Sequence, residues 1–176
     1  IINTPHNPTG TLFSHQELML IAELCCRHNL LAICDEVYEH ITFGEAKHLR
    51  LGTYPGMHER TLTISSGGKS FSVTGWKIGW AIGPEWLQVG LRRVHQFSVF
   101  ATATPLQYAI ALALRFPDDY FTELRADYEV RRDALVVMLR QSGFLPIVPQ
   151  GSYFVLTDVS TFGRGDAIEF NRWMIT

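Results

Sequence analysis

The feature that most constrains the fold is a short apolar segment that runs directly into two glycines and a lysine. Residues 61–66 (TLTISS) combine β-branched and apolar side chains, which predicts a buried β-strand. Gly67 and Gly68 follow, and glycine allows the positive φ angle that a sharp turn needs. Lys69 is therefore expected at the carboxyl end of a strand, where open α/β sheets bind their ligands.

Two other interpretations of this segment compete with a ligand site. Gly68-Lys69-Ser70 resembles the end of a phosphate-binding P-loop, but that motif needs a glycine five residues before Gly68, where the sequence has Thr63. Lys69 could also be an ordinary solvent-exposed lysine of a loop. A surface lysine seldom follows an apolar strand through two glycines into another aromatic-rich segment, so a ligand role is favoured.

Composition excludes several classes of partner. Hydrophobic residues make up 47% of the 176 residues and charged residues 18%, which predicts a globular chain with a sizeable core. The net charge is −2 and no basic run is present, so neither nucleic acid nor a membrane surface is an expected partner. No apolar run reaches the roughly 18 to 20 residues of a membrane span, and no targeting segment is found, which predicts a cytoplasmic protein.

The three cysteines are predicted to be buried, reduced thiols. Cys25, Cys26 and Cys34 form an odd set, and the first two are neighbours on a predicted helix. That pattern fits neither a disulfide framework nor a metal site, so no metal is expected.

The first part of the chain is predicted to form a βαβ unit. Residues 1–3 read as the end of a strand that already lies inside a domain. Residues 14–29 form a helix that starts with a capping box, and residues 30–35 form a buried parallel strand. Such a unit places the carboxyl ends of its strands at one edge of a sheet.

Three polar side chains are expected at that edge. Asn7 lies on a stiff, proline-rich loop, Asp35 ends the second strand, and Tyr38 follows it. A buried carboxylate such as Asp35 is costly unless a positive group meets it. Two structural alternatives remain open, because Asn7 could cap its own turn and Asp35 could cap a following helical turn.

The rest of the chain is predicted to be mostly helical. The expected elements are a strand at 78–83, helices at 85–96, 105–114 and 118–142, a strand pair within 144–160, and a last helix that begins near 166. The helix at 105–114 is apolar nearly all round and should be buried. The helix at 118–142 is long enough to connect two domains.

The chemistry gathered at the predicted edge is an amide, a carboxylate, a phenol, a hydroxyl and two amines: Asn7, Asp35, Tyr38, Ser66, Lys69 and Lys77. A ligand that uses all of them has a protonatable ring nitrogen, a phenolate oxygen, a phosphate and an aldehyde, which describes pyridoxal phosphate. Ser66 would hold the phosphate, Lys69 would condense with the aldehyde, and Asp35 would keep the ring nitrogen protonated. Asn7 and Tyr38 would donate to the phenolate oxygen, and Lys69 would also act as the base.

These motifs resemble class I pyridoxal-phosphate-dependent aminotransferases of fold type I. The motifs are Asn7-Pro-Thr-Gly10, Asp35-Glu-Val-Tyr38, Ser66-x-x-Lys69 and Thr74-Gly-Trp-Lys77. Within that class, the runs TGWKIGW, VHQFSVF and PQGSYF resemble the branch of kynurenine aminotransferase, glutamine transaminase K and methionine aminotransferase. The resemblance covers essentially the whole chain.

The resemblance implies an α/β fold with a pyridoxal-phosphate-binding large domain, whose mostly parallel sheet has helices on both faces, and part of a smaller α+β domain. Residues 1–125 would belong to the first and 126–176 to the second, connected by the helix at 118–142. The family's Gly-rich phosphate loop, ring-stacking aromatic residue and carboxylate-binding arginine have no counterpart in residues 1–176. The isolated chain is therefore expected to be a poor catalyst.

The resemblance also assigns roles to single residues. It implies Lys69 as the lysine that forms a Schiff base with the cofactor, with Asp35 on the ring nitrogen. Asn7 and Tyr38 would bind the ring hydroxyl, and Ser66 and Lys77 the phosphate. It further implies a homodimer in which the loop around Phe100 lines the neighbouring subunit's substrate pocket, while Asn7 contacts substrate.

The implied reaction moves an amino group from methionine, glutamine or an aromatic amino acid to a 2-oxo acid. A β-lyase acting on cysteine conjugates is one alternative, and a non-catalytic, dimerising domain of the same fold is another. Intact Lys69, Asp35 and Tyr38 favour an enzyme, because a site that had lost its reaction has no reason to keep all three.

Overall fold

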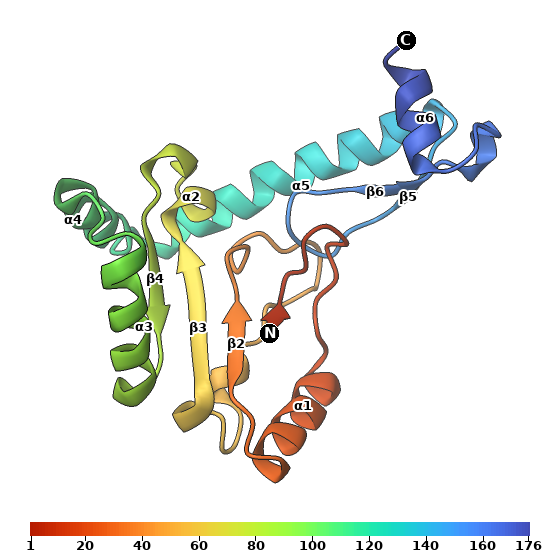
Figure 1. Ribbon diagram of the computed structural model, residues 1–176. Coiled ribbons are helices and arrows are strands. Elements are labelled where there is room, and N and C mark those ends of the chain that lie inside the picture. The colour runs from red at the N-terminus through yellow and green to blue at the C-terminus, as the bar shows by residue number, and fades with distance from the viewer.

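The computed structural model describes residues 1–176, which form a four-stranded sheet and a two-stranded sheet connected by a long helix (Figure 1). The large sheet has the order β1-β2-β3-β4, formed by β1 (Ile2–Asn3), β2 (Ala32–Asp35), β3 (Thr61–Ser66) and β4 (Gly79–Ile82). The first three strands are parallel and β4 is antiparallel to β3. The mostly parallel sheet agrees with the predicted α/β class.

The helices are α1 (His15–Arg27), the single turn α2 (Gly67–Ser70), α3 (Glu85–Ser98), α4 (Thr104–Ala113), α5 (Asp118–Gln141) and α6 (Ala167–Met174). The second sheet pairs β5 (Leu145–Ile147) with β6 (Leu156–Asp158) in antiparallel fashion. In Figure 1, α1 lies beside β2 and α3 lies beside β4, so helices flank the large sheet at both of its sides.

The main hydrophobic core lies between α1 and one face of the large sheet. The predicted capping box is confirmed: the Ser14 side chain accepts the N–H of Glu17, and the Glu17 carboxylate accepts the N–H of Ser14 at 2.7 Å. The apolar positions Leu18, Ala22 and Cys25 recur at helical spacing and are buried. They pack on side chains of β2 and of the following loop, which include Ala32, Cys34, Leu51 and Met57.

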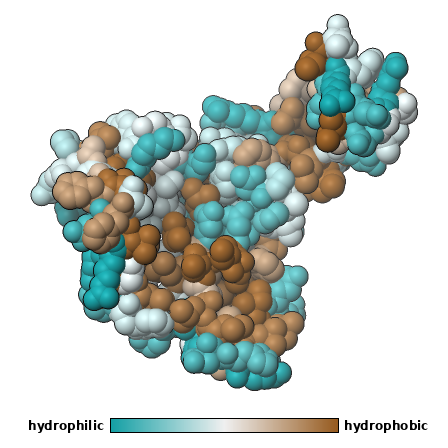
Figure 2. Space-filling model, in the orientation of Figure 1, coloured by the Kyte–Doolittle hydropathy of each residue, from teal (hydrophilic) through white to brown (hydrophobic).

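The other face of the sheet carries apolar side chains that the described residues leave open. Along β2 the side chains alternate, so Ala32 and Cys34 are buried while Ile33 remains 39% exposed. Figure 2 shows apolar side chains gathered over the middle of the sheet, between α1 and α3.

The antiparallel direction of β4 brings two lysines to one end of the sheet. Ser66, the last residue of β3, pairs with Gly79, the first residue of β4. The segment between them carries Lys69 and Lys77, which therefore both lie beyond the carboxyl end of β3. The expectation that Lys77 returns to the edge of Lys69 is confirmed.

The expectation that Gly67 and Gly68 take positive φ is wrong. Both residues begin α2, and positive φ occurs instead at Ser72 and Lys77, each at 56°. The reason for a glycine at 67 is space, because a Cβ atom there would lie 2.4 Å from Cδ1 of Ile110. The close packing of α4 on this turn therefore explains the glycine.

The prediction of a buried helix at 105–114 is wrong in this chain. Helix α4 starts one residue earlier than expected, with Ala103 at its N-cap, and Ile110 is its one buried residue. Tyr108 is 75% exposed and Leu112 is 66% exposed. Within this chain only the side of α4 that carries Ile110 is buried, and its other apolar side chains form an exposed surface.

The predicted long helix and strand pair are confirmed. Helix α5 has 24 residues and ends before Gly143, whose φ of +86° stops it. The β5–β6 pair and α6 lie at the far end of α5, away from the large sheet (Figure 1). None of the helices combines the length and the apolar character needed to cross a membrane. The division into domains at residues 125 and 126 stays a prediction.

The loop between β5 and β6 returns to the large sheet. The N–H groups of Gln150 and Gly151 donate to the carbonyl of Gly10 at 3.0 and 2.9 Å, and Ser152 donates to Ile41 at 2.9 Å. Gly10 has a φ of +69°, and a Cβ atom there would lie 2.2 Å from Cβ of Pro149. Glycine is therefore required where the two loops meet.

The three cysteines are free thiols, but only two of them are buried. Cys25 and Cys34 are buried, whereas Cys26 is exposed, so the prediction of burial is wrong for Cys26. Neighbouring residues of a helix point about 100° apart, and only Cys25 faces the sheet. Burial, together with the negative charge of Glu36, raises the pKa of the Cys34 thiol to about 12.

We expect one fast thiol in the folded chain. Cys26 should react with an aromatic disulfide reagent within minutes at pH 8, because its side chain is exposed to the reagent. Cys34 should react only after unfolding, since it is buried and its raised pKa keeps it protonated. Spectrophotometric thiol counting before and after denaturant checks this, and Cys26→Ser should remove the fast phase. A fast phase of two or three thiols would contradict the structure.

Candidate active site

Lys69 lies in the single turn of helix that follows β3. Strand β3 ends at Ser66, and α2 begins at the next residue, so the chain lifts Lys69 above the carboxyl end of the sheet. The side chain is half-buried and lines a pocket of ≈ 340 Å³. The other residues of this pocket are Ser66, Gly68, Thr74, Lys77, Ile78 and Gly79. Two hydroxyls and two lysine side chains thus line one small cavity.

Two aromatic rings contact the amine of Lys69. Its Nζ atom lies 6.0 Å from the ring centroid of Tyr38 and 5.3 Å from that of Tyr153. The two rings themselves meet edge to face with centroids 5.2 Å apart. Contacts of a cation with ring faces are attractive, so the rings hold the amine above the turn that follows β2.

Tyr38 is buried and remains a neutral phenol. Burial is the main cause that raises its pKa above the ordinary value, and Tyr153 and the negative charge of Asp35 add to the effect. The side chain of Asn7 acts in the opposite direction. These influences show that Asn7, Asp35 and Tyr38 share one local environment. Because the phenol keeps its proton, Tyr38 can donate a hydrogen bond to a negatively charged oxygen.

Asp35 ends β2 and partly caps its own turn. One carboxylate oxygen, Oδ1, accepts the N–H of Val37 at 3.3 Å, so the capping interpretation is correct for that oxygen. The structure gives no intramolecular hydrogen bond to Oδ2. A carboxylate with one oxygen fixed by the backbone can present the other to a cation.

Asn3 connects the loops that carry Asn7 and Asp35, and the sequence analysis missed it. Its Nδ2 atom donates to the carbonyl of Asp35 at 3.1 Å, and its Oδ1 atom accepts the N–H of Asn7 at 2.7 Å. Asn3 is the last residue of β1 and pairs in register with Asp35. The signal that could have revealed it is this position, directly opposite Asp35 in the parallel pair.

Tyr153 is the second residue that was missed. It lies in the loop between β5 and β6, and its ring lies against both Lys69 and Tyr38. Its ring also stacks on Tyr128 of α5, with centroids 5.9 Å apart. No local sequence pattern links Tyr153 to residues more than 80 positions earlier, so only the tertiary fold reveals it.

Phe100 is not brought to the other predicted residues. It follows the end of α3, is 80% exposed and has a φ of +68°. It lines none of the pocket around Lys69. A larger pocket of ≈ 450 Å³ lies on another part of the sheet, where Glu39, Arg50 and Trp80 line it, and it contains none of the predicted site residues.

Comparison with known proteins gives a consistent result. The family model "Aminotransferase class I and II" matches residues 1–172. Kynurenine–oxoglutarate transaminase 3 of Rattus norvegicus is 48% identical over 170 residues, which cover 93% of this chain and 37% of that protein. The chain thus spans little more than a third of the length of that relative.

Solved structures agree. N-succinyldiaminopimelate aminotransferase of Mycobacterium tuberculosis superposes with a TM-score of 0.93 at 46% identity, over 96% of this chain and 44% of that one. An Escherichia coli protein with a methionine aminotransferase function superposes with a TM-score of 0.91 at 35% identity, over 98% of this chain and 46% of that one. The resemblance found in the sequence is therefore confirmed, and so is the predicted fold class.

Proposed function

The chain belongs to the class I and II aminotransferase family, and on that premise we propose that it forms the cofactor-binding part of a pyridoxal-phosphate-dependent aminotransferase. The observation that carries the proposal is the convergence on Lys69. Its half-buried amine lies within 6.0 Å of the Tyr38 ring centroid and lines the same pocket as Ser66 and Lys77. The turns that follow β2 and β3 thus bring a neutral phenol and a lysine together beside a polar pocket.

The residues present fit pyridoxal phosphate. The pocket around Lys69 offers donors for a phosphate, which are the hydroxyl of Ser66 and the amine of Lys77. Two glycines line the cavity where the backbone is closely packed: a Cβ atom at Gly68 would lie 3.2 Å from Cα of Thr74, and one at Gly79 would lie 2.8 Å from the carbonyl oxygen of Ser65. The cofactor, when bound, supplies an electron sink for a carbanion at the substrate's α-carbon.

Four residues of the chain have distinct proposed roles. Lys69 would provide the amine that holds the cofactor and, when that amine is free, a base for moving the substrate proton. Asp35 offers a carboxylate oxygen that keeps a ring nitrogen protonated. Tyr38, with its proton retained by a raised pKa, donates to the ring oxygen, and Asn7 donates beside it.

For the substrates, we propose an amino acid as donor and a 2-oxo acid as acceptor. The donor would be methionine, glutamine or an aromatic amino acid, because the relatives that resemble this chain include a kynurenine–oxoglutarate transaminase and a protein with a methionine aminotransferase function. A panel of amino donors offered with one oxo acid would identify the preferred side chain.

We also propose that the whole protein is a homodimer. The segment from the end of α3 to α4 exposes several large apolar side chains, among them Phe97 at 90%, Phe100 at 80% and Tyr108 at 75%. Exposed apolar surface of this kind is typical of interfaces. In that dimer Phe100 would reach the substrate pocket of the neighbouring subunit.

Borohydride reduction tests the proposal, because it converts the bond between the cofactor and its lysine into a stable secondary amine. The chain has three lysines, Lys47, Lys69 and Lys77. We expect the whole protein, incubated with pyridoxal phosphate and reduced, to carry the pyridoxyl group on the peptide that contains Lys69. Mass spectrometry of a digest locates it. The exposed Lys47 serves as an internal control for non-specific reaction.

Two outcomes would contradict the proposal. A pyridoxyl group on Lys77 or Lys47 in place of Lys69 would overturn the assignment of the site. A protein that takes up no cofactor at all would favour a non-catalytic domain of the same fold.

A further inference from the structure

A carboxylate that the proposed reaction does not use is buried beside the site. Glu36, the residue after Asp35, is fully buried. Its Oε2 atom accepts a hydrogen bond from Nε2 of His48 at 2.7 Å, and Nε of Arg50 lies 3.7 Å from the same oxygen. The side chain of His48 is only 5% exposed, whereas that of Arg50 is 55% exposed. His48 is therefore the buried partner of Glu36.

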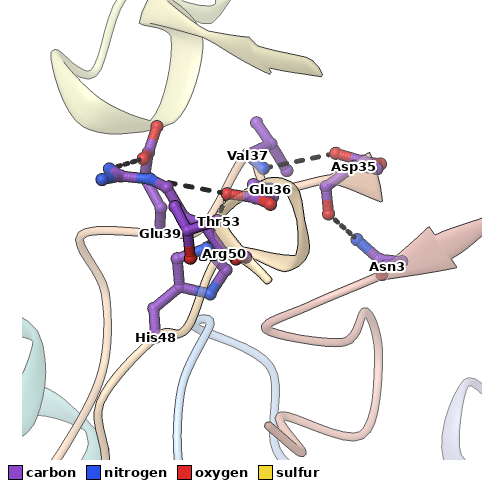
Figure 3. Close-up of polar contacts among 8 residues, drawn as sticks. All are labelled: Asn3, Asp35, Glu36, Val37, Glu39, His48, Arg50 and Thr53. Atoms are coloured by element: carbon purple, nitrogen blue, oxygen red, sulfur yellow. Dashed lines mark hydrogen bonds and ion pairs between the residues drawn. The ribbon is translucent and has the colours of Figure 1, made fainter. Parts of the chain in front are cut away.

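The backbone links the side-chain direction of Glu36 to that of Asp35. The N–H of Glu36 donates to the carbonyl of Ile64 at 2.8 Å, which extends the pairing of β2 with β3 by one residue. In such an extended segment successive side chains point to opposite faces. Figure 3 shows the result: His48 and Arg50 approach Glu36 from one side, while Asn3 approaches Asp35 from the other.

Glu36 also takes part in the turn that follows β2. The carbonyl of Glu36 accepts the N–H of Glu39 at 2.9 Å, and the turn contains Tyr38. Glu39 in turn pairs with Arg50 at 2.5 Å. Burial raises the pKa of Glu39, but hydrogen bonds from Arg50 and Ser65 and the positive charges nearby together hold that pKa below its usual value. Any rotation of Glu36 about the strand axis would therefore move both Asp35 and Tyr38.

We propose that the buried Glu36–His48 pair is a positioning device that sets the direction of Asp35 and Tyr38 toward the cofactor. This inference rests on the proposed function of the site. Neither residue touches the pocket around Lys69. The pair acts through the backbone. Its hydrogen bond holds the side chain of Glu36 on the face of the sheet where His48 lies, and the alternation of side chains then holds Asp35 on the opposite face.

Stability alone is a poor explanation for this pair. Buried charged pairs seldom stabilise a fold more than well-packed apolar side chains of the same volume do. This one also leaves two buried polar atoms without hydrogen bonds, Oε1 of Glu36 and Nδ1 of His48, and such atoms are costly. What a directional pair adds over apolar packing is one defined orientation of the chain.

The test separates positioning from stability with a double replacement in the whole protein. Single variants Glu36→Leu and His48→Leu each leave one polar partner buried alone and should lower the Tm. The double variant Glu36→Leu with His48→Leu removes both and should regain most of the lost Tm. If the pair positions Asp35, the double variant should still bind pyridoxal phosphate on the order of 10- to 100-fold more weakly than wild type, because small misplacements at a site have effects of that size.

Two further variants keep the test decisive if the leucine variants do not fold. Glu36→Gln preserves the shape and can still accept the hydrogen bond from His48, so it should keep the cofactor affinity close to that of wild type. Glu36→Gln combined with His48→Phe removes the hydrogen bond without leaving a carboxylate buried alone, and it should weaken cofactor binding several-fold and shift the pH at which the absorbance of the bound cofactor changes. Glu85→Gln removes a carboxylate from an exposed ion pair on α3 and should change nothing.

The outcomes divide clearly. Wild-type affinity and an unchanged absorbance profile in the folded leucine double variant, or in Glu36→Gln with His48→Phe, would overturn the positioning role and leave the proposed function intact. Failure of the wild type itself to bind pyridoxal phosphate would overturn the proposed function, and this inference with it.

Discussion

Replacing Lys69 with alanine is expected to lower the transaminase kcat of the whole protein by roughly 10³- to 10⁴-fold or more, because it removes both the amine that bonds to the cofactor and the base that moves the proton. The fold should survive the change. Lys69 is half-buried, and the contacts of its amine are with the faces of the Tyr38 and Tyr153 rings. Steady-state kinetics with one amino donor and one oxo acid, together with circular dichroism, measure both effects.

Two matched replacements sharpen the result. Lys69→Arg keeps the positive charge over the two rings but replaces the amine with a guanidinium that stays protonated, so it should be as inactive as Lys69→Ala. Lys47→Ala removes an exposed lysine of a distant loop and should retain wild-type kcat. Near-normal turnover in Lys69→Ala would show that another group does the chemistry.

The parts of the fold that the sequence predicted best are those set by local patterns. Strand β3 was expected at 61–66 and is found there, and α1 begins at the expected capping box of Ser14 and Glu17. The last helix, α6, likewise begins near residue 166 as predicted, with Asp166 at its N-cap. In each case a periodicity or a cap lies within a few residues of the element, so no distant contact is needed to identify it.

The incorrect predictions concern residues whose environment depends on a segment that is distant in the sequence. Gly67 was assigned a turn conformation, but its role is to admit Ile110 from α4. The same helix was expected to be buried because its composition is apolar, yet composition does not say which segment covers it. Cys26 was expected inside because the three cysteines fit neither a disulfide framework nor a metal site, but only one of two adjacent helical residues can face the sheet, and that residue is Cys25.

The residues of the candidate site also fall into those that a local pattern identifies and those that depend on long-range contacts. Asp35, Tyr38, Ser66 and Lys69 were predicted because each follows a strand whose end could be recognised, and parallel strands end at one edge. Asn3 depends on the register between β1 and β2, and Tyr153 arrives from the loop between β5 and β6. Register and long-range loop contacts are properties of the folded chain, and single-sequence patterns do not encode them.

Replacing Asp35 with asparagine is the second change for which we expect a large effect. The substitution preserves Oδ1, so the hydrogen bond from Val37 and the local turn should persist. It removes the negative charge that keeps a ring nitrogen protonated, and a hydrogen bond to a charged group contributes about 1.5–3 kcal/mol. Pyridoxal phosphate should therefore bind roughly 10- to 150-fold more weakly. Equilibrium titration of the apoprotein measures the affinity.

The rate should fall further than the affinity, and that difference identifies the role of Asp35. A residue that only binds the cofactor affects saturation, so excess pyridoxal phosphate would restore turnover. A residue that keeps the ring nitrogen protonated also affects the chemical step, so kcat should stay low at saturating cofactor. Asp127→Asn, in an exposed ion pair with Arg131 on α5, is the matched carboxylate control and should leave both quantities unchanged. Full recovery of kcat in Asp35→Asn at saturating cofactor would place the charge of Asp35 outside the reaction and reduce its part to holding the turn before Tyr38.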